Sequence, residues 1–298
     1  MRGLYLLGVA VVVACSSRGG DDPAITPAKS SSSSSSSSGG ATDPTRPAGD
    51  ADGGGSSAVT GVAAIDPSAT WNIDLENPVD ETSGATFFDV DLWDNLESGL
   101  VARLHAKNKK VICYFSAGSG EDWRPDYASI PAAALGKGLD GWPGEKWLDT
   151  RSDGLRTIMK ARLDKAKAAG CDGVDPDNVD GYANDSGFPL TADTQLDYNR
   201  FLAREAHARG LAVGLKNDVE QVEALVSSFD FAVNESCFQF NECDAVAAFV
   251  AANKSVLNIE YGDVAAHQTS VCPKANALKF FSILSQADKL DGTYTKCR

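Results

Sequence analysis

The stretch GCDGVDPDNVDGY, residues 170–182, decides the fold class, because it joins the end of a predicted helix to a short buried strand. Gly170 is a typical residue at a helix C-terminus, and residues 173–177 read as the strand. The strand and the turn after it carry three acids, Asp175, Asp177 and Asp180. Carboxylates this close repel one another and raise one another's pKa, so the group indicates a site that binds something.

The same alternation of strand and helix extends to both sides of this stretch. Helical patterns cover residues 158–169 and 194–209, and another begins at Asp218, a typical N-cap residue. The predicted strands are residues 71–75, 86–92, 110–116, 173–177, 212–216, 229–234, 256–261 and, with the least regular pattern, 278–284. Repeated strand–helix–strand units predict a parallel sheet, and these strands favour an α/β domain with the (β/α)8 TIM-barrel fold over an open doubly wound sheet.

The N-terminus reads as an export signal. The apolar run of residues 4–14 is too short to span a bilayer and fits the h-region of a signal peptide. It runs into VVAC, which resembles a bacterial lipobox, so we expect residues 1–15 to be a lipoprotein-type signal and Cys15 to be acylated. The alternative is an ordinary secretory signal with an incidental cysteine. With the lipid anchor, we expect an exported protein held in the cell envelope, at the outer membrane or the cell surface.

A flexible linker is predicted after the signal. Residues 16–68 are rich in Ser, Gly, Pro and Asp and contain an unbroken serine run from Ser30 to Ser38. Such a composition cannot bury enough apolar surface to fold. Residues 69–298 therefore remain as one catalytic domain, long enough for a single barrel-sized core.

The balance of charged residues indicates which class of molecule the protein binds. The chain has 41 Asp and Glu residues against 27 Lys and Arg residues, a formal net charge of -14. This balance argues against nucleic acid, whose binding relies on basic surface, and favours a neutral or cationic partner. We expect a monomer that uses no cofactor and no metal and that meets the membrane through its lipid anchor alone.

Six cysteines remain if Cys15 is acylated, and an even number in an exported protein indicates disulfides. These are Cys113, Cys171, Cys237, Cys243, Cys272 and Cys297. The simplest connectivity joins 237 to 243, 272 to 297, and 113 to 171, although other pairings stay open. None of the six has CxxC spacing, which argues against a zinc site.

Polar residues gather at the C-terminal ends of the predicted strands, where the active sites of TIM barrels lie. We expect the substrate to be bound by Asp74, Asp91, Tyr114, Ser116, Trp123, Asp175, Asn178, Asp180, Tyr182, Lys216, Asn217 and Glu260. Residues 117–149 form a long connection whose residues Trp123, Trp142 and Trp147 suit the wall of a sugar cleft.

Two carboxylates end strands that face one another across the predicted barrel. Alternation along residues 173–177 places Asp175 and Asp177 on one face, with Asp177 nearer the open end. Glu235 ends the row of inward-facing apolar residues in the sixth strand. Glycoside hydrolysis needs two such carboxylates, one to protonate the leaving oxygen and one to attack the anomeric carbon or activate water. We therefore expect Asp177 and Glu235 to be the catalytic pair.

Other chemistries fit the same residues less well. A calcium loop that starts at Asp175 has Val179 where an oxygen ligand is required. A Ser-His-Asp triad is unfavoured, because His105 and His207 lie in helical patterns and His267 lies in a polar connection.

Three site residues keep a second interpretation. Lys216 has the chemistry for a Schiff base, but no cofactor motif lies beside it, and a substrate contact or an ion pair fits it better. Glu260 either contacts sugar or only pairs with another group, and Asp180 either contacts sugar or caps the turn.

Several long blocks resemble glycoside hydrolase family 114, the endo-α-1,4-polygalactosaminidases. They are KVICYFSAGSGEDWRPD (110–126), LDGWPGEKWLD (139–149), GCDGVDPDNVDGY (170–182), GLKND (214–218), FDFAVNESCFQFNEC (229–243) and IEYG (259–262). The resemblance covers nearly all of residues 71–298. It implies a barrel that cleaves α-1,4-linked galactosamine polymers, such as biofilm exopolysaccharide, from within the chain.

The resemblance also implies roles for the two carboxylates. Asp177 matches the nucleophile best, with Asp175 as its competitor, and Glu235 matches the general acid/base of a retaining enzyme. Glu235 would then need a raised pKa, which we expect neighbouring carboxylates to provide. Galactosamine carries an ammonium group with which Asp175, Asp180, Asp91 or Glu260 would pair. The alternatives are a hydrolase of another α-galactosidic polysaccharide and a non-catalytic amino-sugar-binding surface lipoprotein.

Overall fold

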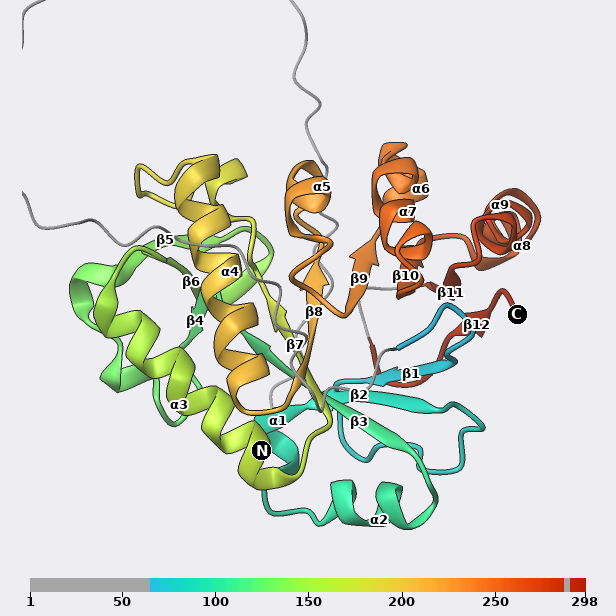
Figure 1. Cartoon of the computed structure of the whole chain (residues 1–298), viewed down its shortest axis with the longest axis horizontal. Coiled ribbons are helices and arrows are strands. Elements are labelled where there is room, and N and C mark those ends of the chain that lie inside the picture. The colour runs from blue at the N-terminus through green and yellow to red at the C-terminus, as the bar shows by residue number, and fades with distance from the viewer. Residues whose placement is uncertain (1–64, 287–289) are drawn as a thin grey trace, which may run out of the picture. The chain divides into compact units, whose positions relative to one another are not determined.

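Eight parallel strands form the sheet in the part of the chain that the computed structural model describes, residues 65–286 and 290–298 (Figure 1). In spatial order they are β1 (Trp71–Asp74), β2 (Phe87–Asp91), β3 (Lys110–Ser116), β7 (Gly173–Asp177), β8 (Ala212–Lys216), β9 (Phe231–Glu235), β10 (Ser255–Tyr261) and β11 (Phe281–Ser285). Each lies at or within a few residues of its predicted position. The signal, Cys15 and the linker up to residue 64 lie outside the described residues.

The sheet curls into the predicted barrel, with the C-terminal segment at its seam. β12 (Thr295–Lys296) pairs antiparallel with β11, and Asp291 forms an antiparallel bridge with Asp74 of β1. The backbone N–H of Leu75 donates to the carbonyl of Leu290 at 2.6 Å. Among the described strands β1 and β11 are not direct neighbours, so this segment fills the place between them.

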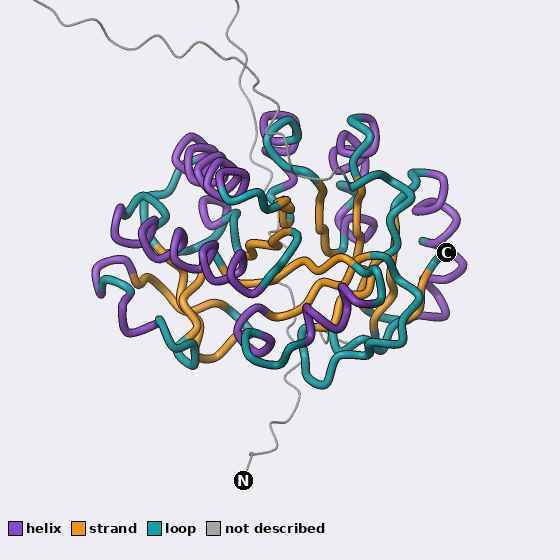
Figure 2. Tube along the Cα trace, turned by 60° about the horizontal axis from the view of Figure 1, so that its bottom comes forward, coloured by secondary structure: helices purple, strands orange, loops and turns teal. Residues whose placement is uncertain are grey.

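Helices and loops surround the strands (Figure 2). The helices are α1 (Leu92–Asn95), α2 (Leu100–Ala106), α3 (Asp153–Ala169), α4 (Ala192–Ala208), α5 (Val222–Leu225), α6 (Cys237–Phe240), α7 (Cys243–Ala251), α8 (Val264–Ser270) and α9 (Cys272–Ala277). Helix α3 ends at Gly170, which has the left-handed φ of 90° expected of a helix stop. No helix within the described ranges is long and apolar enough to cross a membrane.

Asp218 occupies the predicted N-cap position, but its side chain does not cap the turn. A short 3₁₀ turn, Val219–Gln221, does begin there and leads into α5, but the Asp218 side chain makes no capping bond. Instead its Oδ2 accepts a 2.7 Å hydrogen bond from Asn199 on α4. Its backbone has a left-handed φ of 44°, which directs the side chain away from the turn it precedes.

The long connection at residues 117–149 is a small sheet rather than a loop. We call it the inserted sheet. Its antiparallel strands are β4 (Ser119–Glu121), β5 (Leu135–Leu139) and β6 (Trp142–Leu148), in the order β4-β6-β5. Two 3₁₀ turns, Tyr127–Ser129 and Ala132–Ala134, join β4 to β5.

Alternation along the strands divides the apolar residues between two cores. Inside the barrel Trp71 packs on Phe231 with ring centroids 5.1 Å apart, together with Ile112, Leu257 and other inward-facing residues. The second core lies between the sheet and the helices. Burial of each such side chain contributes about 1.5–3 kcal/mol. Ile65 also packs in the inner core, four residues before the predicted start of the domain at Ala69.

All three predicted disulfides are confirmed. Cys113 bonds Cys171, which ties β3 to the start of β7, and Cys237 bonds Cys243 between α6 and α7. The third bond joins 272 to 297, so it fastens α9 to the segment at the barrel seam.

Candidate active site

A cleft of about 1180 Å³ opens at the C-terminal ends of the strands, between the loops there and the inserted sheet. Twelve carboxylate side chains of the described lining face only three cationic ones, Arg124, Lys137 and Lys216. Each of these cations is already paired: Arg124 with Asp91, Lys137 with Asp185, and Lys216 with the acids described below. The cleft therefore has a strongly negative character.

Lys216, at the end of β8, is the centre of the site. Its side chain is 2% exposed, and its Nζ lies 3.7 Å from Asp177 Oδ1, 3.8 Å from Glu235 Oε2 and 3.7 Å from Asp175 Oδ2. Burial alone lowers the pKa of this amine, but the surrounding carboxylates outweigh burial and raise it above its ordinary value. A permanently charged amine is not a nucleophile, which favours the ion-pair role over a Schiff base.

Asp177 occupies the last position of β7 and faces the cleft. Its Oδ2 accepts a 2.8 Å hydrogen bond from the Tyr114 hydroxyl, and its Oδ1 accepts one of 2.7 Å from the Asn178 backbone N–H. The Asp177 side chain is 19% exposed, whereas that of Asp175 is fully buried and does not line the cleft. Of the two competing aspartates, a substrate can reach Asp177.

Glu235, at the end of β9, faces the same cleft, and its predicted pKa shift is wrong. Its oxygens accept hydrogen bonds from Tyr261 at 2.6 Å and from Asn217 at 3.1 Å. Burial raises the pKa of Glu235, but the Lys216 ammonium and these two donors lower it further than burial raises it. The expectation of a raised pKa counted the neighbouring carboxylates and not the buried cation.

The two carboxylates stand close enough to act on one bond. Asp177 Oδ1 and Glu235 Oε2 both lie within 3.8 Å of the same nitrogen, so they are no more than about twice that distance apart. That separation is compatible with the carboxyl pairs of glycosidases. We find no group of three or more metal-ligating side chains arranged around a common point in residues 65–286 and 290–298.

A second group of acids lies beside this pair. Burial and the charge of Asp177 raise the pKa of Asp180 to about 6. Burial and the charge of Asp180 raise the pKa of Asp218 to about 8. The Tyr182 hydroxyl donates to Glu220 at 3.0 Å on the same wall. A cation in the cleft would stabilise the ionised forms of these carboxyl groups.

Most of the predicted site residues meet in the cleft. Those that line it are Asp91, Tyr114, Trp123, Asp177, Asn178, Asp180, Tyr182, Lys216, Asn217 and Glu235. Asp91 accepts hydrogen bonds of 2.6 Å and 3.0 Å from Arg124, so its negative charge is already paired with an arginine of the inserted sheet.

Four predicted substrate contacts do not line the cleft: Asp74, Ser116, Asp175 and Glu260. For Glu260 the strand parity favours the second interpretation, in which it only pairs with another group. Leu257 and Ile259 of β10 face the barrel interior, so Glu260 points outward, where it accepts from the Phe238 backbone N–H at 2.9 Å. The next residue, Tyr261, shares the inward parity and reaches Glu235. The same alternation rule, applied to this strand, would have found Tyr261.

Asp74 is buried, and its Oδ2 accepts the backbone N–H of Asp80 at 3.0 Å near the barrel seam. Ser116 is buried and bonds Asn178, so it supports a cleft residue without facing the cleft. Sequence reasoning missed Glu145 of β6, which lines the cleft from the inserted sheet. The pattern of residues 117–149 predicts a connection without strands, so nothing in it points to Glu145.

The histidines lie away from the site, as expected. His105 and His207 pair with Asp172 and Asp230 at 2.8 Å and 2.9 Å. His267 belongs to helix α8 rather than to a polar connection. No histidine occurs among the described cleft-lining residues, so a histidine-based triad has no support there.

Comparison with known proteins agrees with this geometry. The crystal structure of Aspergillus fumigatus Ega3 in complex with galactosamine is 39% identical, with a TM-score of 0.73 over 79% of this chain and 97% of that one. The glycoside hydrolase domain of PelA from Pseudomonas aeruginosa shares the fold at 14% identity, with a TM-score of 0.59 over 76% of this chain and 96% of that one. No curated protein matches the chain significantly.

The match to the family described as Glycoside-hydrolase family GH114 spans residues 55–298, the described barrel included. The expected family and the expected barrel are therefore confirmed. The chain belongs to glycoside hydrolase family 114, and it is a glycosidase.

Proposed function

We propose that this glycosidase cleaves α-1,4-linked galactosamine polymers from within the chain, with retention of configuration. The observation that carries the proposal is the approach of Asp177 and Glu235 to the one buried ammonium of Lys216, at 3.7 Å and 3.8 Å, on the floor of an open cleft. Asp177 is the nucleophile and Glu235 is the general acid/base.

In the first step Asp177 attacks the anomeric carbon while Glu235 gives a proton to the leaving oxygen, which yields a covalent glycosyl-enzyme. In the second step Glu235 takes a proton from water, and that water releases the sugar from Asp177. Lys216 Nζ lies 3.7 Å from Asp177 Oδ1 and balances the charge of the attacking carboxylate. In the open cleft the pKa of Glu235 is lowered. When the polymer displaces water, the free-energy cost of a buried charge rises, and Glu235 then takes up its proton.

The substrate class is supported by charge. Galactosamine units that lack the acetyl group are cationic, and the described lining has twelve carboxylates against three paired cations. Such a cleft concentrates a cationic polymer and pairs with its ammonium groups. Ega3, the 39% identical relative, is described in complex with galactosamine.

Endo action is supported by three aromatic side chains on the rim. Trp123 and Trp142 of the inserted sheet and Phe240 of α6 are each 53% exposed, and all three line the cleft. Exposed aromatic faces stack on sugar rings, and platforms on two walls suit a chain that passes through the cleft. Trp142→Ala should weaken cleavage of polymer more than cleavage of short oligomers.

The decisive experiment follows products from partially deacetylated α-1,4-galactosaminan by mass spectrometry. The purified protein should release oligomers, and Asp177→Asn and Glu235→Gln should not. An activated aryl leaving group needs no proton, so it should restore the first step of Glu235→Gln and not of Asp177→Asn. Retained polymer without product from the parent would favour a binding lipoprotein. Cleavage of other α-galactosidic polymers alone would change the substrate class.

We also propose that the protein is an exported, monomeric lipoprotein, which rests on the VVAC pattern that ends at Cys15. Metabolic labelling with a fatty acid should mark the parent and not Cys15→Ala. Light scattering of the purified protein tests the monomer.

A further inference from the structure

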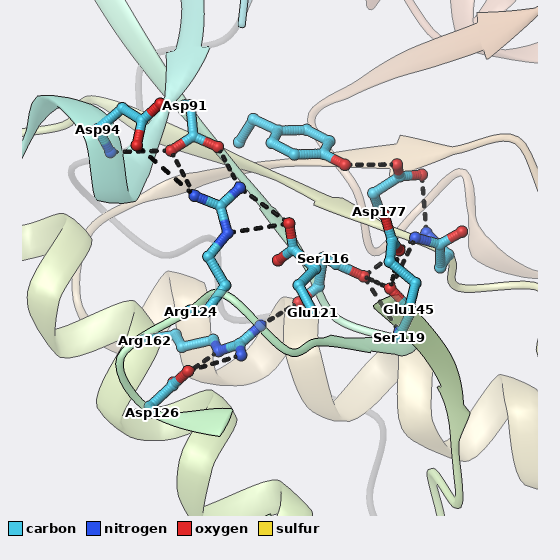
Figure 3. Close-up of polar contacts among 12 residues, drawn as sticks. Asp91, Asp94, Ser116, Ser119, Glu121, Arg124, Asp126, Glu145, Arg162 and Asp177 are labelled. Carbon is cyan, nitrogen blue, oxygen red and sulfur yellow. Dashed lines mark hydrogen bonds and ion pairs between the residues drawn. The ribbon is translucent and has the colours of Figure 1, made fainter. Parts of the chain in front are cut away.

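A line of hydrogen bonds leads from Asp177 into the inserted sheet (Figure 3). The backbone N–H of Asn178 donates to Asp177, and the Asn178 side-chain amide donates to Ser116 Oγ at 3.0 Å and Ser119 Oγ at 3.3 Å. The two hydroxyl groups lie 2.6 Å apart, and Ser119 Oγ donates to Glu145 Oε2 at 2.6 Å. The line therefore ends on a carboxyl group of β6.

The donors and acceptors along this line can be arranged in one direction. A hydroxyl group has one proton to donate and two lone pairs that accept. Ser119 spends its proton on Glu145, so Ser116 must donate in the contact between the serines. Ser116 then accepts from the Ser119 backbone N–H and from the Asn178 amide, both at 3.0 Å. Each hydroxyl group then uses its one proton and both of its lone pairs. The Glu145 acceptor therefore fixes the direction in which the hydrogen bonds of the line donate.

Asn178 needs such support because its backbone is held in an uncommon conformation. Its φ is 59°, in the left-handed region, which costs roughly 1 kcal/mol or more for a residue with a side chain. The Asn178 N–H donates to the carboxylate of the residue before it. The N–H groups of Ala117 and Gly118 also hold the Asp177 carbonyl at 2.8 Å and 3.0 Å.

The register of the inserted sheet brings Glu145 to Ser119. Ser119 pairs with Trp147, and Glu121 pairs with Glu145, so Ser119 and Glu145 are diagonal neighbours on adjacent strands. Behind Ser116, the buried Arg162 of α3 donates to its carbonyl at 2.5 Å. Asn178 is thus supported by β3, α3 and the inserted sheet, all of them elements outside strand β7.

We propose that Glu145, acting through Ser119, Ser116 and Asn178, is a positioning residue that aims the carboxylate of Asp177 at the anomeric carbon. The proposal rests on the proposed function, which makes Asp177 the nucleophile. The inserted sheet is then part of the catalytic support as well as a wall of the cleft. A misplaced nucleophile slows the chemical step without weakening substrate binding.

The test uses four variants of the purified protein and steady-state kinetics on a soluble galactosamine oligomer. Ser119→Ala and Glu145→Leu remove a member of the line and should lower kcat about tenfold or more, with KM within about threefold of the parent. Glu145→Gln keeps an acceptor oxygen and should recover most of that kcat. Ser186→Ala is the matched control, a buried serine outside the cleft lining whose hydroxyl contacts only Phe188 among the described residues.

Several outcomes would overturn the proposal. They are an unchanged kcat in Ser119→Ala and Glu145→Leu, a raised KM with unchanged kcat, and an equal loss in Glu145→Gln and Glu145→Leu. Thermal melts of each variant identify misfolding, and Ser116→Ala breaks the same line from its other end if Glu145→Leu does not fold. Activity that survives Asp177→Asn would defeat the proposed function itself, which is a separate result.

Discussion

The hydroxyl group of Tyr261 on β10 donates a 2.6 Å hydrogen bond to Glu235 Oε1 on β9, and this bond, after the Lys216 ammonium, helps to lower the pKa of Glu235. A donor to the ionised form lowers the pKa of a carboxyl group. Tyr261→Phe should therefore raise the pKa of Glu235. Under the proposed role of Glu235 as the acid of the first step, the limb of kcat/KM that falls with rising pH should move to higher pH. Tyr182→Phe, whose hydroxyl bonds Glu220 instead, should leave that limb in place. A limb that stays fixed in Tyr261→Phe would contradict the assignment.

Lys216→Met should destabilise the protein, because it leaves Asp175, Asp177 and Glu235 without their common cation. Loss of one partner from a buried ion pair costs about 3–5 kcal/mol. The ammonium lowers the pKa of Asp175 and of Glu235, so both pKa values rise without it. The variant therefore keeps its stability below the unfolded-state pKa of these two acids and loses it as the pH increases. Urea unfolding should thus show a larger loss at pH 7.5 than at pH 5. Lys137→Met, which removes an exposed pair with Asp185, should cost under about 1 kcal/mol at both pH values.

Asp218→Asn should stabilise the protein above neutral pH. Burial, followed by the charge of Asp180, raises the pKa of Asp218 from 3.8 to about 8. A carboxyl group whose folded-state pKa is raised makes its full contribution to stability below pH 3.8, and that contribution is lost as the pH rises through about 8. Asparagine stays neutral and still accepts from Asn199. We expect a gain of at least about 1 kcal/mol at pH 8, a rise in Tm of about 2–4 °C, and little gain at pH 4. An equal gain in stability at both pH values would show that the raised pKa of Asp218 is not the cause.

Gly118→Ala should disable the site. A Cβ at this position would lie 1.6 Å from the carbonyl oxygen of Asn178, a backbone atom that cannot yield without moving the end of β7. We expect a loss of roughly 2 kcal/mol or more in stability and a large loss of kcat. Gly84→Ala, with nothing within 4 Å of the added carbon, is the matched control. Equal activity of the two variants would show that the close approach is unimportant.

Salt should weaken cleavage of deacetylated polymer and spare acetylated polymer. The acidic lining attracts ammonium groups over a distance that salt shortens, from about 30 Å at 0.01 M ionic strength to about 10 Å at 0.1 M. KM for the deacetylated substrate should therefore rise with added sodium chloride, while KM for the acetylated substrate stays level. Parallel titrations on the two polymers measure this difference. An equal rise in KM for both polymers would show that charge does not determine the preference for deacetylated substrate.

The sequence by itself predicted the barrel and the inward position of the two proposed catalytic carboxylates, because both rest on local spacing. Of the cysteine pairings that it left open, the simplest is the one that the structure has. Inward alternation places Phe231, Val233 and Glu235 on one face of β9, and the same rule places Asp177 at the open end of β7. The pattern of short apolar runs and amphipathic helices repeats often enough to predict the parallel strands.

The tertiary structure alone decided the electrostatics of the pair. The ends of β8 and β10 bring Lys216, Asn217 and Tyr261 to Glu235, and together they reverse the pKa shift expected from nearby acids. Glu145 likewise meets Ser119 only because the register of two strands in the inserted sheet makes them diagonal neighbours. Spacing along one chain segment fixes which face a side chain takes. The charges and donors it meets there depend on which distant strands pack beside it, and that is set when the chain closes into a barrel.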